Sequence, residues 1–356
     1  MNRKARVLCL VLALVSLFGL TQTAYATSDE KVLVVIYSNH FDTEDEFLVY
    51  FNASDLADKY DVTLISLGGT EMTNRVIAEV NNPQADVIYG GSMLNHAQMK
   101  NAGALIQWEP DWAADVDDVY KDSEGYYYGT KTEALNVIGS LVRLEEMGYD
   151  RMPTDWEDLV ANYSGHYFIL NLTGGTSSTM HFAILERYKD PDGYLGVSDE
   201  GWAFMKAFRD GGRKQNDNYK SWFNGTDTPL GMMWPNGVKE AEDTYGLVME
   251  QMNPEYGMPF VTSCVAVTNS GDETRMAAAK EVAQWIGSAQ HQYEFNKESA
   301  AVPVNKKAAE MLPADHQGVK INSKVKTQDI DWDYVLKYAD EWLVELELNY
   351  PCGRND

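Results

Sequence analysis

The chain has 356 residues, with 54 acidic and 29 basic side chains and a formal net charge of −25. This charge argues against nucleic acid and anionic membrane surfaces as partners, because both would repel the protein. It is compatible with an anionic small molecule, since a buried site depends on its local hydrogen-bond donors. The length exceeds what one compact core usually holds and predicts two lobes.

The first 26 residues have the pattern of a cleaved signal peptide. Basic residues at positions 3, 4 and 6 precede an apolar run over 7–20, and Ala24-Tyr25-Ala26 supplies the small residues that a signal peptidase reads. The apolar run is short for a membrane span, although an uncleaved anchor is the alternative. We therefore expect an exported protein, periplasmic or extracellular, with residues 1–26 removed.

The next part of the chain alternates between apolar runs and helix-like segments. The expected strands and helices, in chain order, are a strand at 31–37, a helix at 44–59, strands at 62–67 and 85–89, and helices at 72–80 and 94–103. Such alternation is typical of a doubly wound α/β sheet. Ligands bind such sheets at the carboxyl ends of the strands, where this chain has small and polar residues.

A second α/β pattern follows a segment at 126–136 that we interpret as a strand crossing between lobes. Its expected elements are a helix at 156–159, a strand at 167–170, a helix opened by 174–179, a strand at 230–234 and a loop at 235–237. A return crossing at 259–267 and a helix at 273–286 would rejoin the first lobe. Two lobes joined by crossing strands form a hinge, which lets a cleft close on a ligand.

Two cysteines, Cys264 and Cys352, lie beyond the signal peptide. In an oxidising compartment they could form a disulfide. The alternative is a buried Cys264, which lies in an apolar run, and a loose Cys352 in the polar tail. The sequence is compatible with both.

Six short motifs occur in order along the chain. They are NPQADV at 82–87, GGS at 90–92 with His96, PTDW at 153–156, Asn171 before a Gly/Ser/Thr cluster, a helix at 278–285 followed by PVN at 303–305, and DWDY at 331–334. In this order they resemble the bacterial extracellular solute-binding proteins of the ferric-ion, hexose-phosphate and aminoethylphosphonate type. Much of the matched material is scaffold, so it supports the fold more than the ligand.

The resemblance implies the two-lobed periplasmic-binding-protein fold of type II. Each lobe would be a doubly wound, mostly parallel sheet with helices, and crossing strands would form the hinge. The expected N-terminal lobe is 27–128 plus 262–310, and the expected C-terminal lobe is 129–261 plus 311–356. The resemblance also implies a monomer that captures a small-molecule solute for the membrane permease of an ABC importer.

Twelve residues are candidates for ligand contact, because most of them lie at or just after predicted strand ends. They are Ser38, Asn39, His40, Gly69, Thr70, Gly91, Ser92, His96, Gly175, Thr176, Ser177 and Trp234. Glycines let a ligand approach the backbone, and N–H groups at a helix start favour an anion. Thr176 and Ser177 add hydroxyl donors.

Three of these candidates have specific alternatives. In ferric-binding relatives a histidine in the loop of His40 ligates metal, whereas a lone loop histidine is more often solvated. His96 matches the family's histidine after GGS, and would either line the cleft or pack behind it. Trp234 would either stack on the ligand or pack in the core of its lobe.

For the ligand, we favour a phosphorylated compound, either a sugar phosphate or an organophosphonate. The ferric branch of the family typically uses two adjacent tyrosines where this chain reads Met233-Trp234-Pro235-Asn236, which argues against iron. Ferric iron nevertheless stays an alternative. A cation such as thiamine or a polyamine is another, since the acidic composition and nine tryptophans are compatible with it.

Catalysis is not expected, because the sequence lacks a G-x-S-x-G elbow, an H-E-x-x-H motif and spaced Cys/His sets. No cofactor or resident metal is expected either. A binding protein that reports to a membrane sensor rather than to an importer is compatible with the same sequence.

Overall fold

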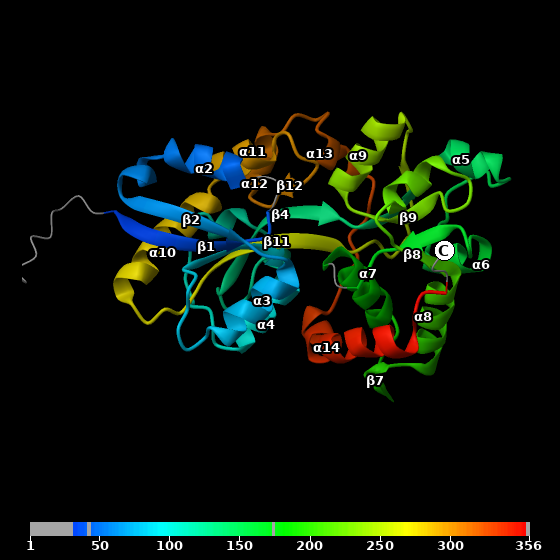
Figure 1. Ribbon diagram of the computed structural model, residues 1–356, viewed down its shortest axis with the longest axis horizontal. Coiled ribbons are helices and arrows are strands. Elements are labelled where there is room, and N and C mark those ends of the chain that lie inside the picture. The colour runs from blue at the N-terminus through cyan, green and yellow to red at the C-terminus, as the bar shows by residue number, and fades with distance from the viewer. Residues whose placement is uncertain (1–30, 41–43, 173–174, 354–356) are drawn as a thin grey trace, which may run out of the picture.

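The structure is a computed structural model that describes residues 31–40, 44–172 and 175–353, so the predicted signal peptide at 1–26 lies outside it. Two α/β lobes lie side by side, each built around one β-sheet, and two long strands run from the first lobe toward the second (Figure 1). The two-lobed α/β architecture predicted from the sequence is therefore confirmed. No helix in the described ranges is both long and apolar enough to span a membrane.

The first sheet has the strand order β12-β4-β11-β3-β1-β2. Its strands are β1 (Val32–Ser38), β2 (Tyr60–Ser66), β3 (Val87–Ser92), β4 (Tyr127–Ala134), β11 (Phe260–Val267) and β12 (Val302–Pro303). β1 is parallel to β2 and β3, whereas β11 is antiparallel to both β3 and β4, and β12 is antiparallel to β4. The sheet is thus mixed rather than mostly parallel, because its crossing strands run against their neighbours.

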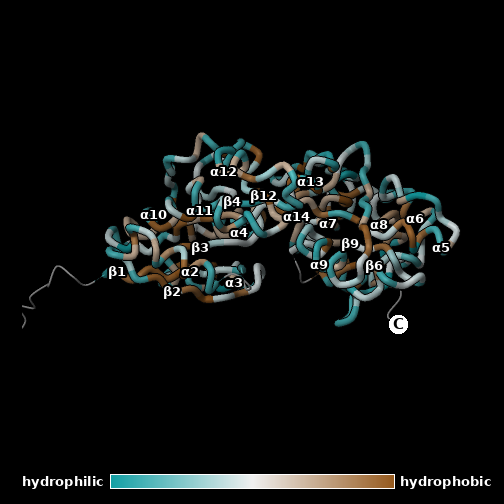
Figure 2. The backbone as a smooth tube through the Cα atoms, turned by 90° about the horizontal axis from the view of Figure 1, so that it is seen from above, coloured by the Kyte–Doolittle hydropathy of each residue, from teal (hydrophilic) through white to brown (hydrophobic). Residues whose placement is uncertain are grey.

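Helices cover both faces of this sheet. They are α2 (Glu44–Asn52), α10 (Glu273–Ile286), α11 (Ala289–Asn296) and α12 (Lys306–Met311) on one side, and α3 (Gly69–Ala78) and α4 (Met93–Asn101) on the other. Alternate residues of β1 enter the two cores: Val34 and Ile36 pack with α2 and α10, and Tyr37 packs with α3 and α4. Burial on both faces explains why the sequence of β1 is a continuous apolar run (Figure 2).

The second sheet has the order β10-β5-β9-β6-β8. Its strands are β5 (Asn136–Gly139), β6 (Tyr167–Ile169), β8 (Gly212–Lys214), β9 (Leu230–Met233) and β10 (Glu250–Gln251). The helices of this lobe are α5 (Leu141–Glu146), α6 (Trp156–Asn162), α7 (Gly175–Glu186), α8 (Asp199–Gly211), α9 (Pro235–Tyr245) and α14 (Trp332–Asn349). This sheet is also mixed, since β6 is parallel to β8 and β9, while β5 is antiparallel to β9 and β10.

The remaining short elements lie at the edges of the lobes or between them. They are β7 (Lys189–Tyr194), α13 (Gln317–Asn322), which contacts β4 and α9, and 3-10 turns at Asp55–Asp58, Ala113–Asp115, Asp118–Tyr120 and Tyr219–Asn224. Within the described residues the chain passes between the sheets three times, from β4 to β5, from β10 to β11, and from β12 to α14. The lobe boundaries predicted at 128/129, 261/262 and 310/311 stay a prediction, because the crossing strands serve both lobes.

Several predicted elements have different limits in the structure. The helix expected at 44–59 ends at Asn52, and the one expected from Met72 begins at Gly69. The predicted loop at 235–237 is the first turn of α9, because Pro235 at the first helical position has the φ angle that a helix start requires.

Cys264 and Cys352 are both free and both buried. Cys264 packs in a core of the first lobe, and Cys352 packs in the core of the second. The disulfide considered from the sequence does not form because the two thiols lie in the cores of different lobes. The alternative of a loose Cys352 is also wrong, since its side chain is covered.

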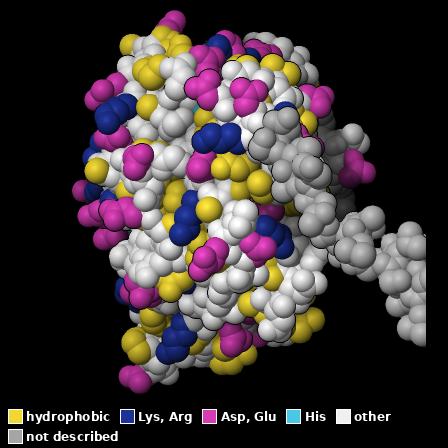
Figure 3. All heavy atoms as spheres, turned by 90° about the vertical axis from the view of Figure 1, so that its left-hand side faces the viewer, with side chains coloured by type: hydrophobic (Ala, Val, Ile, Leu, Met, Phe, Trp, Pro, Cys, Tyr) yellow, Lys and Arg dark blue, Asp and Glu magenta, His cyan; other side chains and the backbone are white. Residues whose placement is uncertain are grey.

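Charged side chains of both signs are interspersed over the end of the first lobe (Figure 3). An example from this lobe is the ion pair of Lys59 with Glu281, whose charged atoms lie 3.0 Å apart and whose side chains are about half exposed. Such exposed pairs contribute little to stability, because water screens them.

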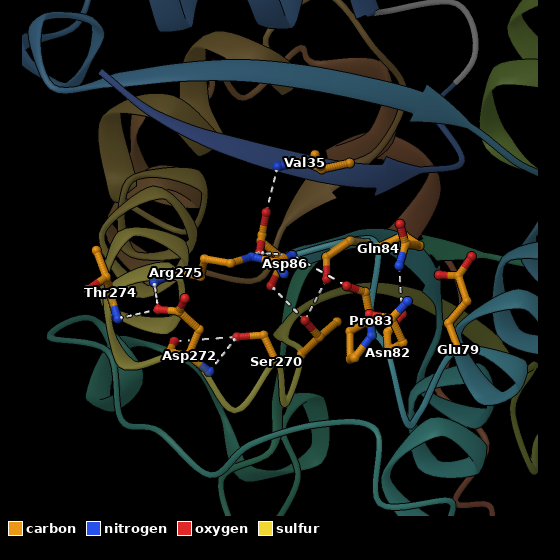
Figure 4. Close-up of polar contacts among 12 residues, drawn as sticks. Val35, Glu79, Asn82, Pro83, Gln84, Asp86, Ser270, Asp272, Thr274 and Arg275 are labelled. Carbon is orange, nitrogen blue, oxygen red and sulfur yellow. Dashed lines mark hydrogen bonds and ion pairs between the residues drawn. The ribbon is translucent and has the colours of Figure 1, made fainter. Parts of the chain in front are cut away.

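A half-buried ion pair ties α10 to the first sheet. Arg275 approaches Asp86 through Nε at 2.9 Å and Nη2 at 2.7 Å, and the second carboxylate oxygen accepts a hydrogen bond from the Val35 N–H at 2.9 Å (Figure 4). Only 3% of the Asp86 side chain is exposed. The NPQADV motif is therefore scaffold, because its aspartate joins strand β1 to a helix far along the chain.

We predict that Arg275→Met will lower the free energy of unfolding by about 3 kcal/mol, because it leaves a buried carboxylate without its cation. Arg275→Lys keeps the charge but loses the two-pronged contact, so it should cost less. Urea denaturation of the three proteins measures both effects. A Met variant as stable as the parent would contradict the assignment.

Candidate ligand-binding cleft

A cleft of about 570 Å³ lies between the two lobes. The first lobe contributes the loop after β1 and the starts of α3 and α4, and the second lobe contributes the ends of β6, β8 and β9, the start of α7 and one face of α14. Residues of the crossing strands β4 and β11 form the wall between these two sides. The cleft thus lies where strand ends of both sheets meet.

The N-termini of four helices in the described residues reach this cleft. Residues at or next to the start of α3, α4, α7 and α9 line it, namely Gly69 and Thr70, Ser92, Gly175 to Ser177, and Trp234. Each helix start carries backbone N–H groups without partners inside the helix and the positive end of the helix dipole. Four such ends around one cavity make it suited to an anion.

The crossing strand β4 places two charged side chains on the cleft. Lys131 and Glu133 alternate with the buried Thr132, so both point to the same side of the strand. Lys131 forms no ion pair or side-chain hydrogen bond within the described residues. Glu133 has one buried carboxylate oxygen, Oε1, that also has no hydrogen-bond partner there. The cleft therefore offers a cation and an acceptor to a ligand.

The GGS segment at the end of β3 fits tightly against the loop after β1. The Asn39 side-chain oxygen accepts a hydrogen bond from the Gly91 N–H at 2.9 Å. Gly90 and Gly91 have φ angles of +100° and +75°, and a Cβ atom on Gly90 would lie 2.0 Å from that same oxygen. Glycine is required here because it adopts positive φ without strain and leaves room for Asn39.

The cleft hydroxyls fall into two groups. Ser92 caps α4 in a reciprocal exchange with Asn95, and Ser177 donates to the Leu170 carbonyl at 2.6 Å. Thr70 and Thr176, by contrast, make no side-chain hydrogen bond in the part of the chain that the structure describes. Thr70 comes from the first lobe and Thr176 from the second, so each side of the cleft has one hydroxyl available to a ligand.

The structure brings ten of the twelve predicted site residues to this cleft. They are Asn39, His40, Gly69, Thr70, Gly91, Ser92, Gly175, Thr176, Ser177 and Trp234. Gly174, which was expected to open the helix with Gly175, lies outside the described residues. The remaining two, Ser38 and His96, are fully buried and lie outside the cleft wall.

The reasons for these two exceptions are local. Ser38 ends β1, and its hydroxyl accepts a hydrogen bond from the His40 N–H at 3.2 Å. His96 lies one turn into α4, where its Nδ1 donates to the Ser92 carbonyl at 3.0 Å and its ring lies 5.5 Å from that of Tyr127. Both side chains therefore lie behind the cleft wall and stabilise it through these contacts.

Burial keeps the histidines near the cleft neutral. Burial lowers the pKa of His96 to about 4, although its hydrogen bond to Ser92 acts in the opposite direction. Burial also lowers the pKa of His40 far below its usual value, and the Lys131 and His291 charges add to this shift. In the part of the chain that the structure covers, no three His, Cys, Asp or Glu side chains gather as metal ligands.

Sequence reasoning missed several cleft residues. The charged ones are Lys131, Glu133 and Asp340, and the amides are Asn74, Asn95, Gln98, Asn171 and Gln215. The sequence did carry a signal for Lys131 and Glu133. Two charged residues two positions apart, in a crossing strand whose other residues are buried, indicate a functional position. Asp340 had none, since α14 reaches the cleft through its packing on α7 and α4, which are far away in the sequence.

A two-lobed α/β protein with a polar cleft over its crossing strands is built to bind a small molecule between its lobes. Residues 82–338 match the profile of the bacterial extracellular solute-binding protein family, and the chain belongs to this family. The probable ABC transporter periplasmic-binding protein y4fP of Sinorhizobium fredii is 32% identical over 294 residues, which cover 81% of this chain and 79% of that relative.

Solved structures with the same type II periplasmic-binding-protein fold include a sugar-phosphate complex and a ferric binding protein. AfuA of Actinobacillus pleuropneumoniae, solved with exogenous fructose-6-phosphate bound, aligns with a TM-score of 0.69 and 18% identity over 90% of this chain and 99% of its own. The ferric binding protein of Campylobacter jejuni aligns with a TM-score of 0.69 and 17% identity over 88% and 98%. At these identities the likeness shows the fold alone.

We predict that His96→Gln will flatten the dependence of stability on pH between 7 and 4.5. The unfolded chain protonates His96 near pH 6.5, while the folded protein resists protonation until about pH 4, so stability is lost as the pH falls through this window. The parent should lose about 2 to 3 kcal/mol more than the variant over that interval. Urea denaturation at both pH values measures the difference, and equal losses would contradict it.

Proposed function

We propose that this protein is the substrate-binding component of an ABC importer and that it captures a phosphorylated small solute, a sugar phosphate or an organophosphonate. The observation that carries this proposal is the convergence of four helix N-termini on one cleft beside Lys131. A phosphate or phosphonate group has several acceptor oxygens and a negative charge, so it can use many N–H donors at once. The partners are the solute and a membrane permease, and the binding unit is a monomer.

The two available hydroxyls support the same assignment. Thr70 and Thr176 stand at the first turns of α3 and α7, on opposite sides of the cleft. A phosphate between them would accept one hydroxyl hydrogen bond from each lobe in addition to the backbone donors. Because the ligand would join both lobes, its binding would favour the closed arrangement of the hinge.

The rest of the cleft suits the polar body of such a solute. Glu133 lines the cleft. Asn171 and Gln215 also line it, and the Asn171 N–H donates to the Gln215 side chain at 2.8 Å. Trp234 adds a flat apolar surface on which a sugar face could stack. Hydroxyl groups of the ligand would therefore find acceptors, while its anionic head occupies the helix starts.

We predict that phosphorylated sugars or phosphonates will raise the melting temperature and that their neutral parents will not. A ligand that binds only the folded state stabilises it in proportion to its concentration and affinity. Differential scanning fluorimetry with matched pairs, such as hexose 6-phosphates and their hexoses, measures the effect. Ferric citrate and thiamine serve as competing ligands, and a shift with either of them alone would overturn the phosphate assignment.

We predict that Lys131→Met and Thr176→Ala will weaken binding of the phosphorylated ligand by about tenfold to a hundredfold and about fivefold to tenfold, respectively. The first change removes a charge-assisted contact and the second removes one hydroxyl donor. Isothermal titration calorimetry measures both affinities. Lys280→Met is the matched control, because it makes the same change in net charge at an exposed position of α10. Equal affinities for Lys131→Met and Lys280→Met would remove Lys131 from the site.

A further inference from the structure

A second cavity of about 380 Å³ adjoins the cleft. Four residues line both spaces, namely Ser92, Leu94, Thr179 and Val261. The other walls of this second chamber come from both lobes: Met93 begins α4, the 118–120 turn contributes Val119 and Tyr120, and the segment 327–332 leads into α14. The two spaces therefore share a common wall at the hinge.

The chamber exists because two strands of the first sheet end at different places. β3 ends at Ser92, which pairs with Ser263, whereas β11 begins three residues earlier at Phe260. Over Phe260–Thr262 the strand has β4 on one edge and, within the described residues, no strand on the other. Phe260–Thr262 and the residues at the end of β3 line the chamber together.

The chamber differs from the cleft in its chemistry. Its wall is rich in large apolar and aromatic side chains, namely Met93, Tyr120, Phe260, Ile330 and Trp332. The cleft wall instead carries hydroxyls, amides, helix N-termini and charges. A solute that filled both spaces would therefore need a polar, anionic end and an apolar end.

One buried amide side chain supports the wall of the chamber. Gln328 lines the chamber and is only 6% exposed, and its Nε2 donates to the Ala183 carbonyl at 2.8 Å. Its Oε1 is buried and has no hydrogen-bond partner in the described ranges. Because this oxygen is covered, Gln328 forms part of the packed wall, and an occupant would meet the apolar and aromatic side chains instead.

We propose that the solute carries an aromatic ring, and that this ring occupies the second chamber while the phosphate occupies the cleft. The inference rests on the proposed function, because the phosphate end is what places the ring at the shared wall of Ser92, Leu94, Thr179 and Val261. The protein thereby selects aryl or heterocyclic phosphates over small alkyl phosphates.

The test compares methyl phosphate, 1-naphthyl phosphate and 3-indolyl phosphate by isothermal titration calorimetry on the full protein. Naphthyl phosphate should bind about tenfold or more tightly than methyl phosphate, because its ring leaves water for an apolar chamber. Indolyl phosphate should bind about as tightly as naphthyl phosphate, because its ring of similar size enters the same apolar chamber. Equal affinities for methyl and naphthyl phosphate would overturn the inference while leaving the phosphate site intact.

A variant that fills the chamber gives the second arm of the test. Thr327 is exposed and lines only the second chamber, so Thr327→Trp should bring the affinities of both aryl phosphates down to that of methyl phosphate. Thr274→Trp, at an exposed position in the first turn of α10, is the matched control and should change nothing. Loss of methyl phosphate binding in Thr327→Trp, or unchanged aryl affinities, would contradict the assignment. Failure of all three phosphates to bind the parent would overturn the proposed function itself.

Discussion

The antiparallel pairing of β4 with β11 is the constraint on which the rest of the molecule depends. Its register places Lys131 opposite Ser263 and Glu133 opposite Val261, and all four of these residues line the cleft. The same two strands belong to the sheet of the first lobe and lead into the second, so one hydrogen-bonded ladder both joins the lobes and forms a wall of the site. A slip of one residue would turn Lys131 and Glu133 away from the ligand and bring the buried Thr132 into the cleft. The register of β4 with β11 therefore specifies the connection between the lobes, the cleft wall and the positions of Lys131 and Glu133.

The helix starts around the cleft serve two competing uses. A helix N-terminus needs its N–H groups satisfied, and a side-chain cap from the same chain satisfies some of them without a ligand. The start of α4 is capped by side chains of the same chain, because Ser92 and Asn95 form a reciprocal capping box. The starts of α3 and α9 do not, since Gly68 and Trp234 at their cap positions provide no side-chain hydrogen bond. One helix is thus fixed in place by its own residues, while the other two keep their donors for the cleft.

The sequence predicted what depends on local or periodic information. Apolar runs revealed β1 and β11, and polar strand ends revealed ten cleft residues, because carboxyl ends of parallel strands gather at one edge. Several family motifs proved to be caps that a sequence reader can recognise: Asp155 caps α6, Asn305 caps α12 and Asp331 caps α14. What escaped prediction needed tertiary information. The burial of Ser38, His96 and Cys352 and the approach of Asp340 to the cleft all depend on packing between segments far apart in the chain.

A net charge of −25 and a cleft suited to an anion coexist because the two act over different distances. In salt of physiological strength, exposed charges more than about 10 Å away are largely screened, whereas donors inside a closing cleft act at contact distance where water is excluded. Contacts already link the two lobes beside this cleft: Gln98 of α4 donates to Asp340 of α14 at 3.2 Å, and the Ala300 N–H donates to Asn236 of α9 at 2.7 Å. Removal of water from between the lobes would strengthen the helix-start donors and Lys131 and would leave the screened acidic surface unchanged. The acidic exterior therefore affects how the protein meets other surfaces, whereas the crossing strands and the four neighbouring helix starts form the cleft that we propose as the binding site.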